Sequence, residues 1–284
     1  MVGQRPFGPP TLALRVLATR QDALAGLRLA VVPLRYLAAI VAAELLTALV
    51  SPRLGILLHV GLLFLLLGHG ALASPPRQRA LLLALTIAPL TRILSLALPL
   101  GDIPRVYWYA LVSLPLAAAG VVIARTIGYS RRQLGVVVCW RRLPLNLLIV
   151  PLGGVFGLLQ YLALRPPPLV GTLTFEQVWL PALILALAGG LVEEFLFRGV
   201  LQRAAVDLLG SRWGLIYGSL IFASLYAGYQ SLPATAIGLG VGGVFALVAY
   251  RTGSLVGVAL APAAAGIGFL LIWPIVVPAL FGGG

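Results

Sequence analysis

The sequence predicts an all-α membrane protein, a polytopic helical bundle of about eight or nine transmembrane spans. Of its 284 residues, 61% are hydrophobic and only 10% are charged, and the mean hydropathy is +1.06. Soluble domains are roughly 25% charged and 45–50% apolar, so this composition suits lipid rather than water. Apolar stretches of about 20 residues, the length that crosses the hydrocarbon core, recur between short links that hold Arg, Pro or Gly.

The elements follow one another from a basic N-terminal segment to a glycine-rich C-terminal half. Residues 1–32 are expected to form an interfacial segment, because Arg15, Arg20 and Asp22 interrupt any signal-peptide core. Prolines, which disfavour a helical residue before them, mark several of the links that follow. The expected spans are approximately 33–50, 54–73, 80–100, 106–124, 144–164, 178–197, 213–229, 233–250 and 254–281. They group into N-terminal transmembrane helices at 33–124, a basic cytoplasmic link at 125–143 and a transmembrane core at 144–284.

The arginines predict the orientation of the chain. All 20 basic residues are Arg, and an N-terminus in the cytoplasm puts sixteen of them in cytoplasmic segments. The opposite loops then hold only three, Arg53, Arg105 and Arg165, with Arg92 inside a span. This is the bias of the positive-inside rule, so the net charge of +13 reports topology and gives no indication of a nucleic-acid partner. The link at 125–143 either lies on lipid headgroups or serves as a topology determinant alone.

Small residues and the single cysteine have mainly structural interpretations. Cys139 is the only cysteine, which excludes an internal disulfide and a multi-cysteine zinc site. Glycines are frequent in the last four spans, among them Gly190, Gly238 and Gly266. They either allow close helix packing in lipid or line a cavity.

Two adjacent acidic residues form the one cluster that can carry chemistry. Only seven acidic residues exist in the chain, and Glu193 and Glu194 stand together at the end of an apolar run. Glu194 and Arg198 are four residues apart, so they share a helix face and can pair, while Glu193 points about 100° away. Glu193 is then free to act as a general base in a partly dry pocket. The alternative is an acidic helix end that merely pairs with Arg198.

This cluster resembles a known motif. The run Leu191-Val192-Glu193-Glu194-Phe195-Leu196-Phe197-Arg198-Gly199 is similar to the EExxxR motif of the CPBP family, intramembrane peptidases that include the CAAX prenyl proteases. Three further stretches agree in order, at 128–135, 218–226 and 251–255. The resemblance covers roughly residues 125–270, and the family domain proper about 178–270.

The resemblance implies roles for particular residues. Glu193 would be the general base that activates a water, with Glu194 and Arg198 supporting it. The second family motif, FxxxH, aligns with Phe222 to Tyr226, so tyrosine takes the histidine position. The third, a histidine followed four residues later by Asn or Asp, falls on Pro262 and Gly266. The candidate catalytic residues are Glu193, Glu194, Arg198 and Tyr226.

No metal or other cofactor is expected, although active relatives use zinc, because the ligand set is incomplete. The only histidines, His59 and His69, lie ten residues apart, or about 15 Å along a helix, and cannot share one zinc ion. Elsewhere, Glu44 and Arg92 either form a buried pair or Arg92 snorkels to the interface. Possible cavity liners are Tyr161, Gln160, Gln202 and Gln230.

Three functions remain open for the sequence. The first is a CPBP-type endopeptidase that cuts a membrane-anchored or membrane-proximal peptide. The second is a catalytically silent relative that binds a partner, acts as a chaperone or serves as a subunit of a membrane complex. The sequence favours the second, because a lone carboxylate does not replace the helper groups that polarise a scissile carbonyl. A transporter would need ionisable residues on several spans, which are largely missing. Arg without Lys suits a bacterial plasma membrane.

Overall fold

The computed structural model describes residues 12–73, 75–137 and 143–281, and within these ranges every regular element is a helix. Cys139 lies outside the described residues. The α-helices are α1 (Leu12–Leu49), α2 (Pro52–Leu72), α3 (Pro76–Leu85), α4 (Ile87–Ala97), α5 (Arg105–Ile127), α6 (Leu143–Leu148), α7 (Val150–Leu164), α8 (Phe175–Leu185), α9 (Gln202–Leu209), α10 (Ser211–Ser224), α11 (Leu232–Thr252), α12 (Leu255–Val258), α13 (Leu260–Ile267) and α14 (Trp273–Phe281). π-Helical segments at Ala186–Val192, Phe195–Leu201 and Gly268–Ile272 and a 3₁₀ turn at Leu225–Tyr229 join some of them. The predicted all-α fold class is confirmed.

Seven helical stretches in the described part of the chain are long and apolar enough to cross a membrane, by length and composition. They are Val31–Leu49, Pro52–Leu72, Pro76–Ala97, Arg105–Ile127, Phe175–Leu209, Leu232–Thr252 and Leu260–Leu280. The other two expected spans correspond to the shorter helices α7 and α10. The chain is therefore an integral membrane protein with roughly the predicted number of spans.

The described helices depart from the expected spans at three places. The expected span 144–164 is divided at Ile149, which stands just before α7 with a proline at the start of that helix. The expected span 213–229 ends as an α-helix at Ser224 and tightens into the 3₁₀ turn. At the N-terminus, α1 begins at Leu12 and runs through Pro33, so the described part of the expected interfacial segment and the first span form one continuous helix. The cytoplasmic location of this end remains a prediction.

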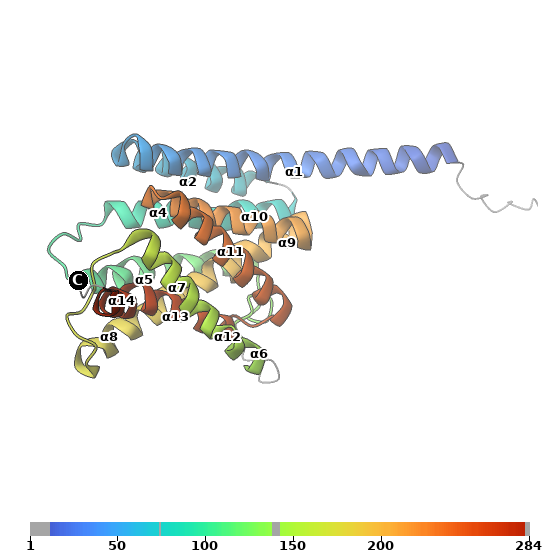
Figure 1. Ribbon diagram of the computed structural model, residues 1–284. Helices are drawn as coiled ribbons and strands as arrows, with labels where there is room; N and C mark the ends of the chain where they lie inside the picture. Colours follow the sequence, from blue (N-terminus) through green and yellow to red (C-terminus); the bar gives the residue numbers. More distant parts are fainter. Residues whose placement is uncertain (1–11, 74, 138–142, 282–284) are drawn as a thin grey trace, which may run out of the picture.

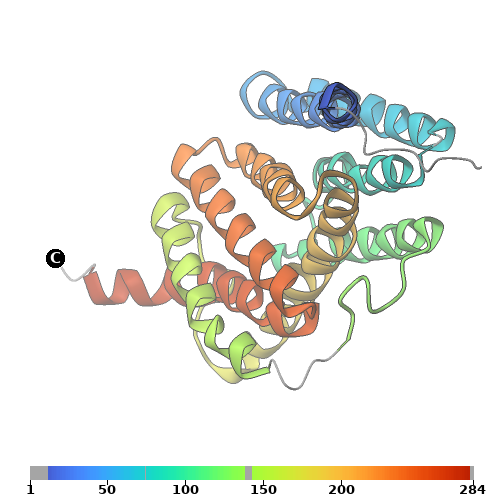
Figure 2. The ribbon, with the colours of Figure 1, turned by 90° about the vertical axis from the view of Figure 1, so that its right-hand side faces the viewer.

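The bundle is arranged in layers. α1 and α2 pack against each other along one side of the bundle, and α3, α4 and α10 lie beneath them (Figure 1). α7, α8 and α13 lie on the opposite side, and the orange and tan helices α9 to α11 lie between the two groups (Figure 2). The stretch from α8 to α9, which carries the acidic pair, has Leu183, Leu187 and Leu191 exposed and is buried from Leu196 to Gln202, so it runs from the surface of the bundle into its interior.

Glycines bring several of these helices into backbone contact. A Cβ on Gly157 of α7 would lie 2.5 Å from the carbonyl oxygen of Ala265 on α13, and Gly153 meets Ala261 in the same way one turn earlier. A Cβ on Gly190 would lie 2.8 Å from the carbonyl oxygen of Ala259. Such approaches supply the van der Waals packing that drives helix association in lipid. Gly190 therefore allows close helix packing, as one of the two interpretations of the glycines expects. Gly266 has open space beside it instead.

A buried ion pair ties the first layer to the second. Nη2 of Arg92 on α4 lies 2.5 Å from Oε2 of Glu44 on α1, and the Glu44 side chain is fully buried. The same Nη2 donates a hydrogen bond of 2.8 Å to the carbonyl oxygen of Leu225 at the start of the 3₁₀ turn. Of the two alternatives for Arg92, the structure therefore shows pairing with Glu44.

Candidate functional site

The acidic pair lies between two π-helical segments. Ala186–Val192 precedes Glu193 and Glu194, and Phe195–Leu201 follows them. A π-turn accommodates an extra residue in the helix, and such turns occur frequently at functional sites. Within this irregular helix, Nη1 of Arg198 lies 3.0 Å from Oε1 of Glu194, and both side chains are almost completely buried. The pairing expected from the spacing of four residues is present.

Arg198 has a second partner in the aromatic core. Its guanidinium carbon lies 4.2 Å from the centre of the Phe222 ring on α10, a cation–π contact. The ring of Phe222 packs in turn on Phe197 and Tyr226. Arg198 therefore fixes Glu194 on one side and the aromatic ring of Phe222 on the other.

Glu193 faces a cavity of about 130 Å³. In contrast to Glu194, its side chain is only partly buried, and among the described residues its carboxylate makes no hydrogen bond or ion pair. The cavity wall is built from α5, α7, α10, α11, α13 and the helical stretch that carries the acidic pair, together with the 3₁₀ turn. The structure thus gives Glu193 the free carboxylate and the adjoining hollow that a general base or a peptide-binding group needs.

Tyr226 enters the same cavity from the 3₁₀ turn. Its hydroxyl accepts a hydrogen bond of 3.1 Å from Nε2 of Gln160 on α7, which leaves the hydroxyl proton available for another acceptor. Its ring occupies the space left by Gly238 of α11, where a Cβ would lie 2.6 Å from Cγ of the tyrosine. Glu193, Tyr226 and Gln160 are therefore brought to one site from three separate elements.

Pro262 and Gly266 of α13 also line this cavity. They stand where the third motif of the resembled family would put a histidine and an Asn or Asp. Neither residue has a polar side chain, so this wall of the cavity presents apolar surface to whatever occupies it. The two residues that the motif alignment singled out therefore line the cavity, and they contribute only apolar surface to it.

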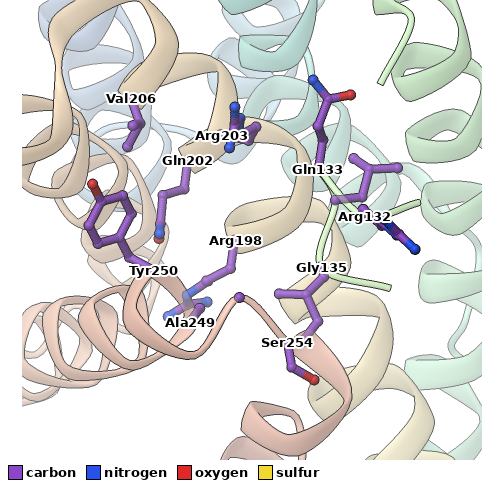
Figure 3. A pocket seen from close by; sticks show the side chains of 13 residues that line it. Arg132, Gln133, Gly135, Arg198, Gln202, Arg203, Val206, Ala249, Tyr250 and Ser254 are labelled. Carbon is purple, nitrogen blue, oxygen red and sulfur yellow. The ribbon is translucent and has the colours of Figure 1, made fainter. Parts of the chain in front are cut away.

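Two further tyrosines, which the sequence did not single out, line the cavity: Tyr109 of α5 and Tyr229 of the 3₁₀ turn. Spacing gave no signal for Tyr109, because it belongs to a span remote in the sequence; Tyr229 could have been found as the residue one turn beyond Tyr226. Of the four expected cavity liners, Gln160 is in this cavity. Gln202 lines a different one, shown in Figure 3, and Gln230 donates a hydrogen bond to the carbonyl oxygen of Ala48. Tyr161 is buried.

Comparison with known families bears directly on this site. Residues 175–266, about a third of the chain, match the family described as type II CAAX prenyl endopeptidase Rce1-like. This match supports the resemblance to the CPBP family over the matched segment. The matched segment begins at α8 and ends within α13, so it contains the acidic pair, Arg198, Tyr226, Pro262 and Gly266. No curated protein and no solved structure matches the chain.

The residues at this CPBP-type cavity do not fit the zinc ion of active relatives. Zinc sites in proteins draw on His, Cys and carboxylate ligands, usually at least three of them. His59 is fully buried with Nε2 3.7 Å from Oε1 of Glu44, and Nδ1 of His69 is 2.9 Å from the hydroxyl of Tyr36. Neither histidine lines the cavity, and the described residues contain no group of three or more His, Cys, Asp or Glu that could hold a metal.

Proposed function

We propose that this CAAX protease-like membrane protein binds a segment of a membrane-anchored peptide in the Glu193 cavity and does not hydrolyse it. The observation that carries the proposal is the composition of the cavity wall. The free carboxylate of Glu193, the amide of Gln160 and three tyrosines line the cavity together with Pro262 and Gly266, and no imidazole is among the lining residues.

The polar groups of Glu193 and Tyr226 can form hydrogen bonds with the N–H and carbonyl groups of a peptide backbone. The carboxylate of Glu193 accepts a hydrogen bond from an amide N–H, and the hydroxyl of Tyr226 donates one to a carbonyl oxygen. Glu194 and Arg198 form an ion pair next to Glu193 on the same helical stretch. A cavity of about 130 Å³ is smaller than the roughly 300–1,000 Å³ of drug-sized pockets, so it accepts one short stretch of a chain.

Hydrolysis would require more than binding. A general base contributes typically 10²–10⁴-fold to a rate, but the developing oxyanion also needs preorganised donors or a metal. Pro262 and Gly266 supply no donor from their side chains, so the hydroxyl groups that line the cavity are those of Tyr109, Tyr226 and Tyr229. The assembly therefore binds a carbonyl better than it activates one.

Peptide hydrolysis with Glu193 as the base and Tyr226 as the oxyanion donor is the second candidate. It is favoured by one observation, that both side chains line the same cavity. In either case we propose a bacterial plasma membrane as the location, because all the basic residues are Arg. We propose a cytoplasmic N-terminus because of the distribution of these arginines along the chain.

Binding is tested with the full-length protein in liposomes and a fluorescent, lipid-anchored peptide library. The Glu193→Gln variant should bind the selected peptides at least about tenfold more weakly, since a hydrogen bond to a charged acceptor is worth about 1.5–3 kcal/mol. Glu176→Gln is the matched control, because Glu176 is an exposed glutamate in the first turn of α8 on the same helical stretch. Equal binding by all three proteins would refute the proposal.

A further inference from the structure

A second cavity, of about 140 Å³, lies at the other end of the stretch that carries the acidic pair (Figure 3). Three segments form it. Arg198, Gln202 and Arg203 come from the helical stretch, Arg132 and Gln133 from the link after α5, and Tyr250 and Ser254 from the end of α11 and the residues after it. A single water needs about 10–15 Å³ by a comparable measure, so the cavity has room for a small polyatomic ion.

The walls of this cavity are fixed by hydrogen bonds between the segments. The backbone N–H of Leu255 donates to the carbonyl oxygen of Gly135 at 2.9 Å, and the hydroxyl of Ser254 donates to that of Val137 at 2.8 Å. Nε2 of Gln202 donates to the carbonyl oxygen of Ala246 at 3.0 Å. The link after α5 is therefore anchored to the end of α11, and the cavity is a defined feature of the fold.

The charged side chains that line this cavity are all positive. Three guanidinium-bearing residues, Arg132, Arg198 and Arg203, line it, and no carboxylate does. Arg198 is buried at the base and paired with Glu194, whereas Arg132 is exposed and its side chain has no hydrogen-bond or ion-pair partner among the described residues. The cavity thus carries an uncompensated positive charge.

Arg203 is only partly engaged by its acidic neighbour. Its contacts with Asp207, at 3.1 and 3.2 Å to the two carboxylate oxygens, both use Nε. Within the described part of the chain its two terminal nitrogens remain without a hydrogen bond. Terminal guanidinium nitrogens form the fork that binds phosphate oxygens in pairs.

We propose that this cavity binds a phosphate group, held by Arg132 and Arg203, with Gln133 and Tyr250 as further donors. The predicted topology puts this end of the bundle at the cytoplasmic headgroup layer, where phosphate is the prevalent anion. The phosphate belongs either to a phospholipid headgroup or to a soluble phosphate compound. The proposal does not depend on the function assigned to the Glu193 cavity, which shares only the Glu194–Arg198 pair with it.

The test measures binding to the purified full-length protein in neutral detergent, at low salt, with three probes. These are inorganic phosphate, dioctanoyl phosphatidic acid, and dioctanoylglycerol, which has the same chains without the phosphate. We expect the phosphatidic acid to bind and the diacylglycerol not to bind. Inorganic phosphate that binds or competes identifies a site for soluble phosphate as well, and phosphate that does neither identifies a site for the lipid headgroup.

The decisive variant is Arg132→Gln/Arg203→Gln, with Arg131→Gln as its matched control. Arg131 is exposed and adjacent to Arg132 but does not line the cavity. The double variant should lose at least about tenfold in affinity for the phosphate-bearing probe, and the control should stay within about twofold. An unchanged affinity in the folded double variant, an equal loss in the control, or no binding of either phosphate-bearing probe to the unmodified protein would overturn the proposal.

Discussion

Removing the positive charge of Arg92 should strongly destabilise the bundle. In the structure Arg92 is the cation 2.5 Å from Glu44, whose side chain is fully buried, and it also caps the carbonyl oxygen of Leu225. Removing one partner of a buried ion pair costs about 3–5 kcal/mol, because the other charge is left without compensation. We therefore expect Arg92→Met to lower the free energy of unfolding by about that amount.

Replacing both charges should cost much less. In the double variant Glu44→Met/Arg92→Met no buried charge remains, and apolar replacements of such pairs are often close to neutral. The unfilled acceptor on Leu225 costs about 1–3 kcal/mol in both variants that lack Arg92, so it does not change the order of their stabilities. The double variant should thus be more stable than Arg92→Met alone.

The measurement is reversible unfolding in mixed micelles, followed by tryptophan fluorescence for the single variants, the double variant and Arg53→Met. Arg53 is an exposed arginine at the start of α2, so its replacement should change stability by less than about 0.5 kcal/mol. If the effects of the two single substitutions simply add in the double variant to within about 0.5 kcal/mol, Glu44 and Arg92 are not coupled and the reasoning is refuted.

Three further outcomes follow from the structure. Gly157→Ala should destabilise the protein by about 1–3 kcal/mol in the same unfolding assay, because its Cβ would meet the backbone of α13, whereas Gly154→Ala, with open space beside it, should not. Tyr226→Phe removes the proposed donor to the peptide and should weaken peptide binding by about two- to tenfold, measured by fluorescence anisotropy; unchanged affinity would exclude the hydroxyl from the binding site. Burial and the neighbouring Asp207 raise the pKa of Tyr129 above its usual 10.0, so its stabilisation is present below about pH 10 and is lost as the pH rises through the folded-state value. Unfolding titrations above pH 10 should therefore show a shallower loss of stability for Tyr129→Phe, and an identical slope would contradict this assignment.

The sequence was sufficient to predict the fold class and the local geometry of the acidic pair. Composition and repeated apolar stretches determine a helical membrane bundle, and a spacing of four residues is enough to pair Glu194 with Arg198 on one face. The division of the helix into π-helical segments around Glu193 was not predicted. π-Turns depend on tertiary packing and leave no periodic pattern in the sequence.

Contacts between distant spans were the part that the sequence left open. From the sequence, Arg92 could either pair with Glu44 or snorkel to the interface. In the structure α4 places Arg92 beside Glu44, and the two side chains form an ion pair. The motif alignment placed Pro262 and Gly266 at the site, and they do line the cavity. Tyr109 could not be found in this way, because only the packing of α5 against the helix of the acidic pair brings it there.

The most direct test of the central claim is mass spectrometry of membrane-anchored peptides that bind the protein, after incubation at equimolar ratio in liposomes. The account predicts that the peptides are recovered intact with the unmodified chain, as they are with Glu193→Gln. Cleavage products that form with the unmodified chain and disappear in Glu193→Gln, while Glu176→Gln still forms them, would show that the cavity is a working peptidase site.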